Sequence, residues 1–142
     1  MEQMQPIIAE LVVENVDASI FWYRGLGFEV DGEGLRDDDG LQWVSMTRDG
    51  RPLWLLRADI SPDDARGAPS VRLYLQVENV DAIYEQLVAR NIPTESAPET
   101  QWYGLREFSV RDPDGYHWIL NHPVPEDQRP PAPSTGTLPG VG

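Results

Sequence analysis

The sequence contains no cysteine and no lysine among its 142 residues, since all 11 basic side chains are arginines. Without cysteine the chain forms no disulfide and offers no thiolate as a nucleophile or zinc ligand. Without lysine it has no amine for a Schiff base and no P-loop lysine. No apolar run reaches the ~18 residues of a membrane-spanning helix, and the first residues lack the basic start and apolar stretch of a signal peptide. We therefore expect a cytoplasmic protein.

Positive charge is also scarce. Acidic residues number 24 against 11 arginines, which gives a net charge of −13. Such a surface repels nucleic acids and anionic lipids, so we expect neither as a partner. It attracts cationic small molecules, but acidity of this kind also serves solubility alone, and the composition leaves both interpretations open.

A six-residue motif occurs twice. Val-Glu-Asn-Val-Asp-Ala stands at residues 13–18 and again at 77–82. Each copy follows an apolar run and precedes a segment with helically spaced apolar residues, and its Asn or Asp is a suitable N-cap. Turns at 47–50 and 112–115 repeat at nearly the same offset. The pattern predicts two copies of a strand, a helix and three strands, at about 6–58 and 70–122, within one domain over residues 1–122.

The composition changes after His122. Residues 123–142 contain six prolines and three glycines and almost no large apolar side chain. Such a segment buries too little apolar surface to offset the entropy lost on ordering. We therefore predict a flexible tail over 123–142.

Two further stretches carry a family resemblance. Residues 21–28 end a predicted helix with aromatic residues and continue into Leu-Gly-Phe, and residues 103–115 run from Tyr-Gly-Leu-Arg to Asp-Pro-Asp-Gly. Together with the duplication they resemble the vicinal oxygen chelate superfamily, which includes glyoxalases, dioxygenases and bleomycin-resistance proteins. The resemblance implies an α+β fold in which tandem βαβββ repeats form a cup-shaped mixed sheet with helices on its outer face. It also implies a homodimer, with the ligand held in the cup.

Enzymes of this superfamily hold a divalent metal through four inward-facing side chains, on the first and last strand of each half. Counting from the repeated motif and from the turn glycines places these positions at Ile8, Trp54, Arg72 and Ile119. None of these side chains is a metal ligand. A register slip of two residues would admit Glu10, Tyr74 and either His117 or Asn121, which is still an incomplete set. We therefore predict no metal and no other cofactor.

The same counting gives a cup lining that is aromatic and apolar with isolated polar groups, which is typical of a pocket for a flat or amphipathic molecule. Trp43 and Phe108 match when counted back from the two turn glycines, and Trp102 and Tyr103 stand in a loop. Trp22, Tyr23 and Trp118 are expected in the core, whereas Trp54 is either a plug or a stacking platform. We predict no catalytic residue; the predicted ligand-binding residues are Glu10, Trp43, Trp54, Arg72, Tyr74, Trp102, Tyr103, Phe108 and His117.

The first functional hypothesis is metal-independent binding and sequestration of a planar, antibiotic-like small molecule, of the bleomycin-resistance type. Its aromatic cup and negative charge suit a cationic guest, and the run Asp37–Asp39 either rings the mouth or is a solvated loop. Arg72 would repel a cation, pair with Glu10, or recognise an acidic or carbonyl group. The alternative is a superfamily enzyme with a divergent metal set or none, in which Glu10, His117 or Tyr103 would act as acid or base. A dimer with a structural or regulatory role is the third hypothesis.

Overall fold

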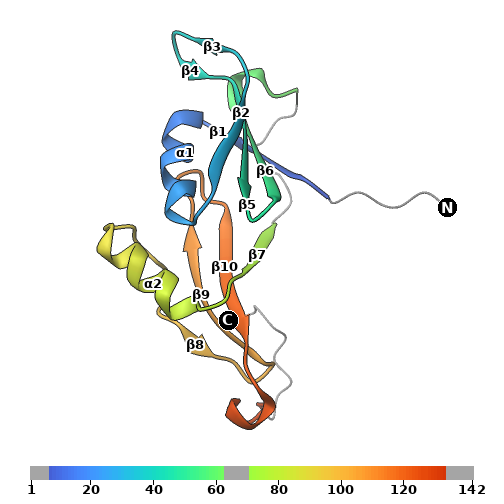
Figure 1. The fold of residues 1–142 in the computed structure, drawn as a ribbon, viewed down its shortest axis with the longest axis vertical. Coiled ribbons are helices and arrows are strands. Elements are labelled where there is room, and N and C mark those ends of the chain that lie inside the picture. The colour runs from blue at the N-terminus through green and yellow to red at the C-terminus, as the bar shows by residue number, and fades with distance from the viewer. Residues whose placement is uncertain (1–6, 63–70, 134–142) are drawn as a thin grey trace, which may run out of the picture. The chain divides into compact units, whose positions relative to one another are not determined.

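The computed structural model describes residues 7–62 and 71–133, and the chain divides into two compact units, residues 1–70 and 71–142. The boundary falls in the junction that the internal repeat predicts. Unit 1 and unit 2 are described separately below (Figure 1).

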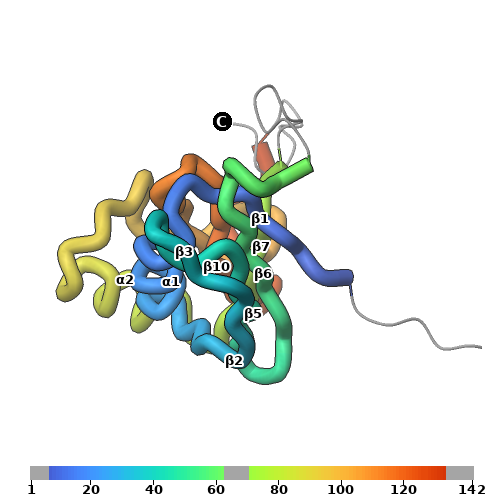
Figure 2. The backbone as a smooth tube through the Cα atoms, turned by 90° about the horizontal axis from the view of Figure 1, so that it is seen from above, coloured from blue at the N-terminus to red at the C-terminus, as the bar shows by residue number. Residues whose placement is uncertain are grey.

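Unit 1 is a four-stranded sheet with one helix. Its strands are β1 (Ala9–Val13), β2 (Glu29–Glu33), β5 (Trp43–Arg48) and β6 (Arg51–Arg57), and α1 spans Val16–Gly25. The strand order is β1-β6-β5-β2, with β1 parallel to β6 and the other pairs antiparallel. Figure 2 shows the path of these strands from above. A two-stranded ribbon of β3 (Arg36–Asp37) and β4 (Gly40–Leu41) and a 3₁₀ turn, η1 (Ala58–Ile60), complete the unit.

Unit 2 repeats this arrangement. Its strands are β7 (Arg72–Gln76), β8 (Glu99–Thr100), β9 (Leu105–Arg111) and β10 (His117–Pro123), and α2 spans Val80–Ala89. The order is β7-β10-β9-β8, again with the first strand parallel to the last and the rest antiparallel. The α+β class and the tandem βαβββ organisation are thus confirmed.

The repeated motif starts both helices in the same way. The side chains of Asn15 and Asn79 accept hydrogen bonds from the backbone N–H groups of Ala18 and Ala82, at 3.0 and 3.2 Å. Both Asn residues have extended backbones, as N-caps do. Of the two cap candidates in each copy of the motif, Asn or Asp, the structure selects the Asn.

In each unit the helix covers one face of the sheet and buries the apolar side chains that alternate along the strands. In unit 1 these include Leu11, Val44 and Leu55, and the helix contributes the fully buried Tyr23. In unit 2 they include Phe108 and Leu120, with Leu87 from the helix. Of the residues expected in the core, Tyr23 and Trp118 are buried, whereas Trp22 is half-buried beside Tyr23.

The two hairpins differ in length. Arg48 of β5 pairs with Arg51 of β6, so Asp49 and Gly50 alone make the turn, both with positive φ (52° and 76°), as in a type I′ turn. In unit 2 the Gly115 N–H donates to the Asp112 carbonyl and the Asp112 N–H to the Tyr116 carbonyl, which leaves three residues between Asp112 and Tyr116. The second hairpin therefore has one residue more than the first.

The predicted start of the tail lies several residues too early. β10 includes Pro123, and the side chain of Val124 is buried. The Val124 N–H donates to the Gly104 carbonyl at 2.9 Å, and after the 3₁₀ turn η2 (Glu126–Gln128) the Arg129 Nε donates to the Val124 carbonyl at 2.9 Å. These contacts order residues 124–129, called the C-terminal brace below, despite their proline content. Residues 134–142 lie outside the described part of the chain.

Candidate ligand-binding site

Each sheet has a second face that its own helix does not cover, called here the helix-free face. In unit 1 the register places Glu10, Trp54 and Ser45 in one row of this face. Val12, Leu56 and Trp43 form the next row. The predicted residues Glu10, Trp43 and Trp54 therefore come together.

Two tryptophans dominate the helix-free face of unit 1. The rings of Trp43 and Trp54 meet edge to face, with centroids 5.4 Å apart and an angle of 72° between their planes. The indole N–H of Trp43 donates to Glu10 Oε2 at 3.1 Å, which fixes the orientation of that ring. Both indoles are half-buried, so each keeps part of its surface exposed. The arrangement is an aromatic surface with a carboxylate at its edge, which suits a flat or cationic ring.

The helix-free face of unit 2 is more polar. Its rows are Arg72 with His117, Tyr74 with Ile119 and Ser109, and Gln76 with Asn121 and Glu107. The register places the predicted residues Arg72, Tyr74 and His117 together on this face, and their contact with a ligand stays a prediction. Tyr74 has 47% of its surface exposed.

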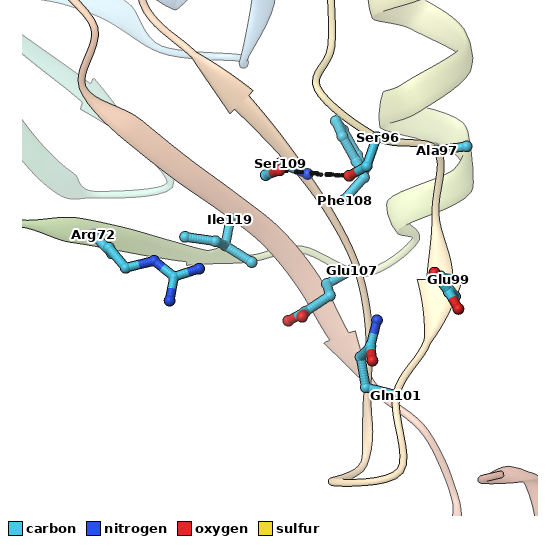
Figure 3. A pocket seen from close by; sticks show the side chains of 9 residues that line it. All are labelled: Arg72, Ser96, Ala97, Glu99, Gln101, Glu107, Phe108, Ser109 and Ile119. Atoms are coloured by element: carbon cyan, nitrogen blue, oxygen red, sulfur yellow. Dashed lines mark hydrogen bonds between the residues drawn. The ribbon is translucent and has the colours of Figure 1, made fainter. Parts of the chain in front are cut away.

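A shallow pocket lies beside β9 (Figure 3). Its volume of about 90 Å³ is well below the ~300–1,000 Å³ of a pocket for a drug-sized ligand. It is therefore large enough for one functional group of such a ligand and not for the whole molecule. The lining residues are Arg72, Ser96, Ala97, Glu99, Gln101, Glu107, Phe108, Ser109 and Ile119.

Glu107, which lines this pocket, forms a hydrogen bond with Tyr103 of the preceding loop. The Tyr103 hydroxyl donates to Glu107 Oε1. Burial raises the pKa of the Tyr103 hydroxyl above its ordinary range, and the hydrogen bond to Glu107 raises it further, so Tyr103 remains a donor at neutral pH. Sequence reasoning missed Glu107. Glu107 could have been found as the residue opposite Asn121 in the β9–β10 pair, but this pairing is known only once the length of the hairpin turn is known.

Trp102 and Tyr103 occupy the loop between β8 and β9, as predicted, with their rings edge to face at 5.5 Å. The following residue, Gly104, has a φ of 98° and lies against the guanidinium of Arg129. The Val124 N–H caps the Gly104 carbonyl. The C-terminal brace therefore supports the turn that carries both aromatic rings.

His117 has one acidic neighbour. Its Nε2 lies 3.4 Å from Glu95 Oε2. Burial lowers the pKa of His117, and the positive charge of Arg111 lowers it further, against the opposing effect of Glu95. Both effects favour the neutral imidazole. The other histidine, His122, accepts from the Val80 N–H through Nδ1 at 2.9 Å and so stabilises the start of α2.

The predicted placement of the Phe108 side chain on the ligand-facing side of the sheet is wrong, although the residue borders the pocket beside β9. Phe108 is 1% exposed and packs edge to face on Tyr84 of α2, with centroids 5.3 Å apart. Figure 3 shows its ring directed toward the helix, away from Glu107. The cause is the extra residue in the second hairpin. Trp43 lies seven residues before Gly50, but seven residues before Gly115 is Phe108, whereas strand pairing makes Glu107 the equivalent of Trp43. A shift of one residue moves a side chain to the opposite face of a strand.

The run Asp37–Asp39 does not act as a unit. Asp37 accepts two hydrogen bonds from the buried guanidinium of Arg57, at 2.6 and 2.7 Å, and Arg57 also binds Asp59. The Arg57 guanidinium holds the pKa of Asp37 well below its usual range. Asp37 thus belongs to a structural ion cluster, while Asp38 and Asp39 are exposed.

The four positions at which the family resemblance implies metal ligands carry Ile8, Trp54, Arg72 and Ile119. The pairing register sets Glu10 beside Trp54 and Tyr74 beside Ile119. Within 7–62 and 71–133, no three side chains of His, Asp or Glu gather where they could hold a metal ion. Metal independence stays a prediction. In the same ranges neither helix has the length and apolar content to cross a membrane.

Comparison with known proteins gives a family match over most of the chain. The model of the Glyoxalase/Bleomycin resistance protein/Dioxygenase superfamily matches residues 6–120. Uncharacterized protein Mb0911c of Mycobacterium bovis and Uncharacterized protein Rv0887c of Mycobacterium tuberculosis are each 33% identical over 81 residues. Those residues are 57% of this chain and 53% and 47% of the relatives, so the match spans about half of their length.

Solved structures share the fold. TioX from Micromonospora sp. ML1 superposes with a TM-score of 0.72 at 18% identity, covering 85% of this chain and all of TioX (100%). A glyoxalase/bleomycin resistance protein/dioxygenase from Nocardioides gives 0.67 at 22% identity, over 94% and 93% of the two chains. Lactoylglutathione lyase from Agrobacterium tumefaciens gives 0.63 at 19% identity, over 86% and 96%. Identities this low establish the fold alone.

Proposed function

The chain belongs to the glyoxalase/bleomycin resistance protein/dioxygenase superfamily, and from that premise we propose that it binds and sequesters a planar, antibiotic-like small molecule without a metal and without changing it chemically. The observation that carries the proposal is the pair of half-buried indoles, Trp43 and Trp54, on the helix-free face of unit 1. Glu10 holds Trp43 in place through its indole N–H. An aromatic surface that is fixed before the ligand arrives loses little entropy on binding.

Charge and side-chain chemistry also support this proposal. The net charge of −13 raises the local concentration of cationic guests. The positions at which the family resemblance implies metal ligands carry apolar or permanently protonated side chains, Ile8, Trp54, Arg72 and Ile119. We further propose a cytoplasmic homodimer, as the family resemblance implies. Phe21 on α1 is 78% exposed and offers apolar surface to a second copy.

The test is a tryptophan-fluorescence titration with bleomycins, quinoxaline peptides and mitomycins. We expect saturable quenching with one site per chain, and recovery of the unchanged compound by mass spectrometry after the complex is denatured. A flat response to all three classes would contradict the proposal. Light scattering on the same sample gives the mass of the assembly and tests the dimer.

A second candidate is a superfamily enzyme with a divergent site. The observation that favours it is that the buried Nε2 of His117 lies 3.4 Å from Glu95 Oε2, because an imidazole beside a carboxylate can act as a general base. Elemental analysis and product detection distinguish the candidates. A stoichiometric transition metal, or turnover that His117→Gln abolishes, would establish the enzyme and exclude simple sequestration.

A further inference from the structure

We propose that Glu107 selects ligands that present an N–H hydrogen-bond donor, by accepting that donor at Oε2 in the pocket of unit 2. The inference deepens the proposed binding function and rests on it. It assigns to the ligand a chemical feature beyond planarity, carried either by a neutral lactam or amide or by a protonated amine or amidine.

The two oxygens of Glu107 have different surroundings. Oε1 accepts the hydroxyl hydrogen of Tyr103. Oε2 is shielded from water and has no hydrogen-bond partner among the described residues. An ionised carboxylate only accepts hydrogen bonds, and a buried acceptor left without a partner is costly. A ligand N–H placed in the pocket would remove that cost, whereas a ligand with acceptors alone would not.

The chain holds this acceptor in place before any ligand binds. Tyr103 is anchored through the turn at Gly104, which the Val124 N–H and the Arg129 guanidinium support. Glu107 itself lies within β9, opposite Asn121 of β10. Strand β9 and the loop that the C-terminal brace supports therefore fix the position of Oε2. A fixed acceptor binds only donors that approach from the right direction, so it can discriminate between ligands.

The charges that line the pocket point in the same direction. Glu99 of β8 lies directly opposite Glu107 of β9, and like charges in this relation repel each other. Arg72 is the one cationic side chain of the described lining, so the lining carries more negative than positive charge. An anionic ligand group in the pocket would be repelled by the carboxylates of Glu99 and Glu107. A ligand N–H donor would instead reduce the repulsion between these two carboxylates.

The experiment compares three tricyclic probes of nearly equal shape at mildly alkaline pH. Acridine is neutral and has only a ring acceptor, acridone is neutral and has a ring N–H, and 9-aminoacridine is a cation with N–H donors. Affinities are measured by fluorescence titration. We expect the wild-type chain to bind acridone and 9-aminoacridine roughly 10-fold more tightly than acridine.

Glu107→Gln is the decisive variant. Its amide oxygen can still accept from Tyr103, while its NH₂ replaces the Oε2 acceptor by a donor. We expect the preference for the two donor probes to disappear or to reverse in favour of acridine. Glu85→Gln, which removes the same charge from the exposed side of α2, should keep the wild-type preference.

The outcomes separate the two proposals. If Glu107→Gln still binds acridine, the variant is folded, and a loss of affinity for the donor probes is specific to the substitution. A loss for both donor probes indicates recognition of the N–H, and a loss for 9-aminoacridine alone indicates that the donor must be charged; each supports the inference. Equal wild-type affinities, or an unchanged preference in Glu107→Gln, would overturn it while leaving planar-ligand binding intact. Failure of all three probes to bind would overturn the inference, and the titration with the three antibiotic classes would then decide the proposed function separately.

Discussion

Trp43 and Glu107 occupy equivalent positions in the two units. Trp43 lies opposite Leu56 in the β5–β6 pair, and Glu107 lies opposite Asn121 in the β9–β10 pair. Leu56 and Asn121 are in turn the partners of Val12 and Gln76 in the parallel pairs. The same place in the repeat thus carries an aromatic ring in unit 1 and a carboxylate in unit 2. The two helix-free faces have diverged into an aromatic surface and a polar one.

Removing either ring of the tryptophan pair should weaken ligand binding. Trp43→Ala and Trp54→Ala each delete a stacking surface that is worth ~1–3 kcal/mol per ring, so we expect a higher Kd for the antibiotic that quenches the wild-type fluorescence. Isothermal titration calorimetry measures the change without relying on tryptophan emission. Trp22→Phe is the matched control, because Trp22 lies on α1 beside Tyr23. An equal loss in that variant would indicate general unfolding.

Removing the Tyr103 hydroxyl should destabilise the chain. Comparison of this variant with the wild type should also show that the pKa of Tyr103 is elevated. Tyr103→Phe leaves Glu107 Oε1 without its donor, which costs about 1 kcal/mol in urea denaturation. Because the folded-state pKa of Tyr103 is raised, its contribution is complete below the ordinary tyrosine range and is lost as the pH rises through the folded pKa. Tyrosine ionisation is followed by ultraviolet absorbance against pH in the wild type and in Tyr103→Phe. The difference between the two curves reports Tyr103 alone, and its midpoint should lie above the ordinary pKa range of tyrosine. A difference curve centred near pH 10 would contradict the geometry.

The cluster around Arg57 should hold the β3–β4 ribbon to β6. Arg57→Gln leaves Asp37 and Asp59 without their shared partner, so Tm should fall further than in Arg90→Gln, which removes an exposed arginine. Arg57 lowers the pKa of the Asp37 and Asp59 carboxyls in the folded chain. The ion pairs therefore add their full stability above the ordinary carboxyl pKa near 4, and this stability is lost as the pH falls through the lowered folded-state pKa values. The difference in Tm between wild type and Arg57→Gln should accordingly narrow in acid. A difference that stays constant would exclude the ion pairs as its source.

Two glycines with similar backbones allow the C-terminal brace to be tested. Gly104 and Gly115 have φ of 98° and 89°, so alanine at either position incurs backbone strain of about 1 kcal/mol. A Cβ at Gly104 would also lie 2.7 Å from Arg129 Cζ, whereas a Cβ at Gly115 meets nothing within 4 Å. We expect Gly104→Ala to be the less stable variant and to lower ligand affinity, and Gly115→Ala to keep wild-type affinity. Equal effects would show that the brace does not position the Trp102–Tyr103 loop.

Local patterns in the sequence were sufficient to predict the architecture. The duplicated motif predicts where both helices start, because an Asn or Asp side chain just before a helical segment is a suitable N-cap. Alternation places Trp118 in the core and Glu10, Trp54 and Arg72 on the helix-free faces. These features depend on short-range periodicity and on chemistry within a few residues.

The errors have longer-range causes. Phe108 was misplaced because the length of a hairpin loop depends on which residues pair across it, and a shared glycine does not report that pairing. Glu107 was missed for the same reason. The brace was missed because composition describes the average behaviour of a segment, while Val124 and Arg129 are ordered by contacts with Gly104.

The extra residue in the second hairpin also bears on how duplicated halves diverge. The residue gained in the turn leaves the two faces of the strand unchanged, because Glu107 and Phe108 pair with β10 as Trp43 and Val44 pair with β6, and it alters only the distance of each residue from the turn glycine. Grafting residues from one half of this protein onto the other will therefore succeed only when the donor and acceptor positions are matched by strand pairing, and will fail when they are matched by counting from the turn.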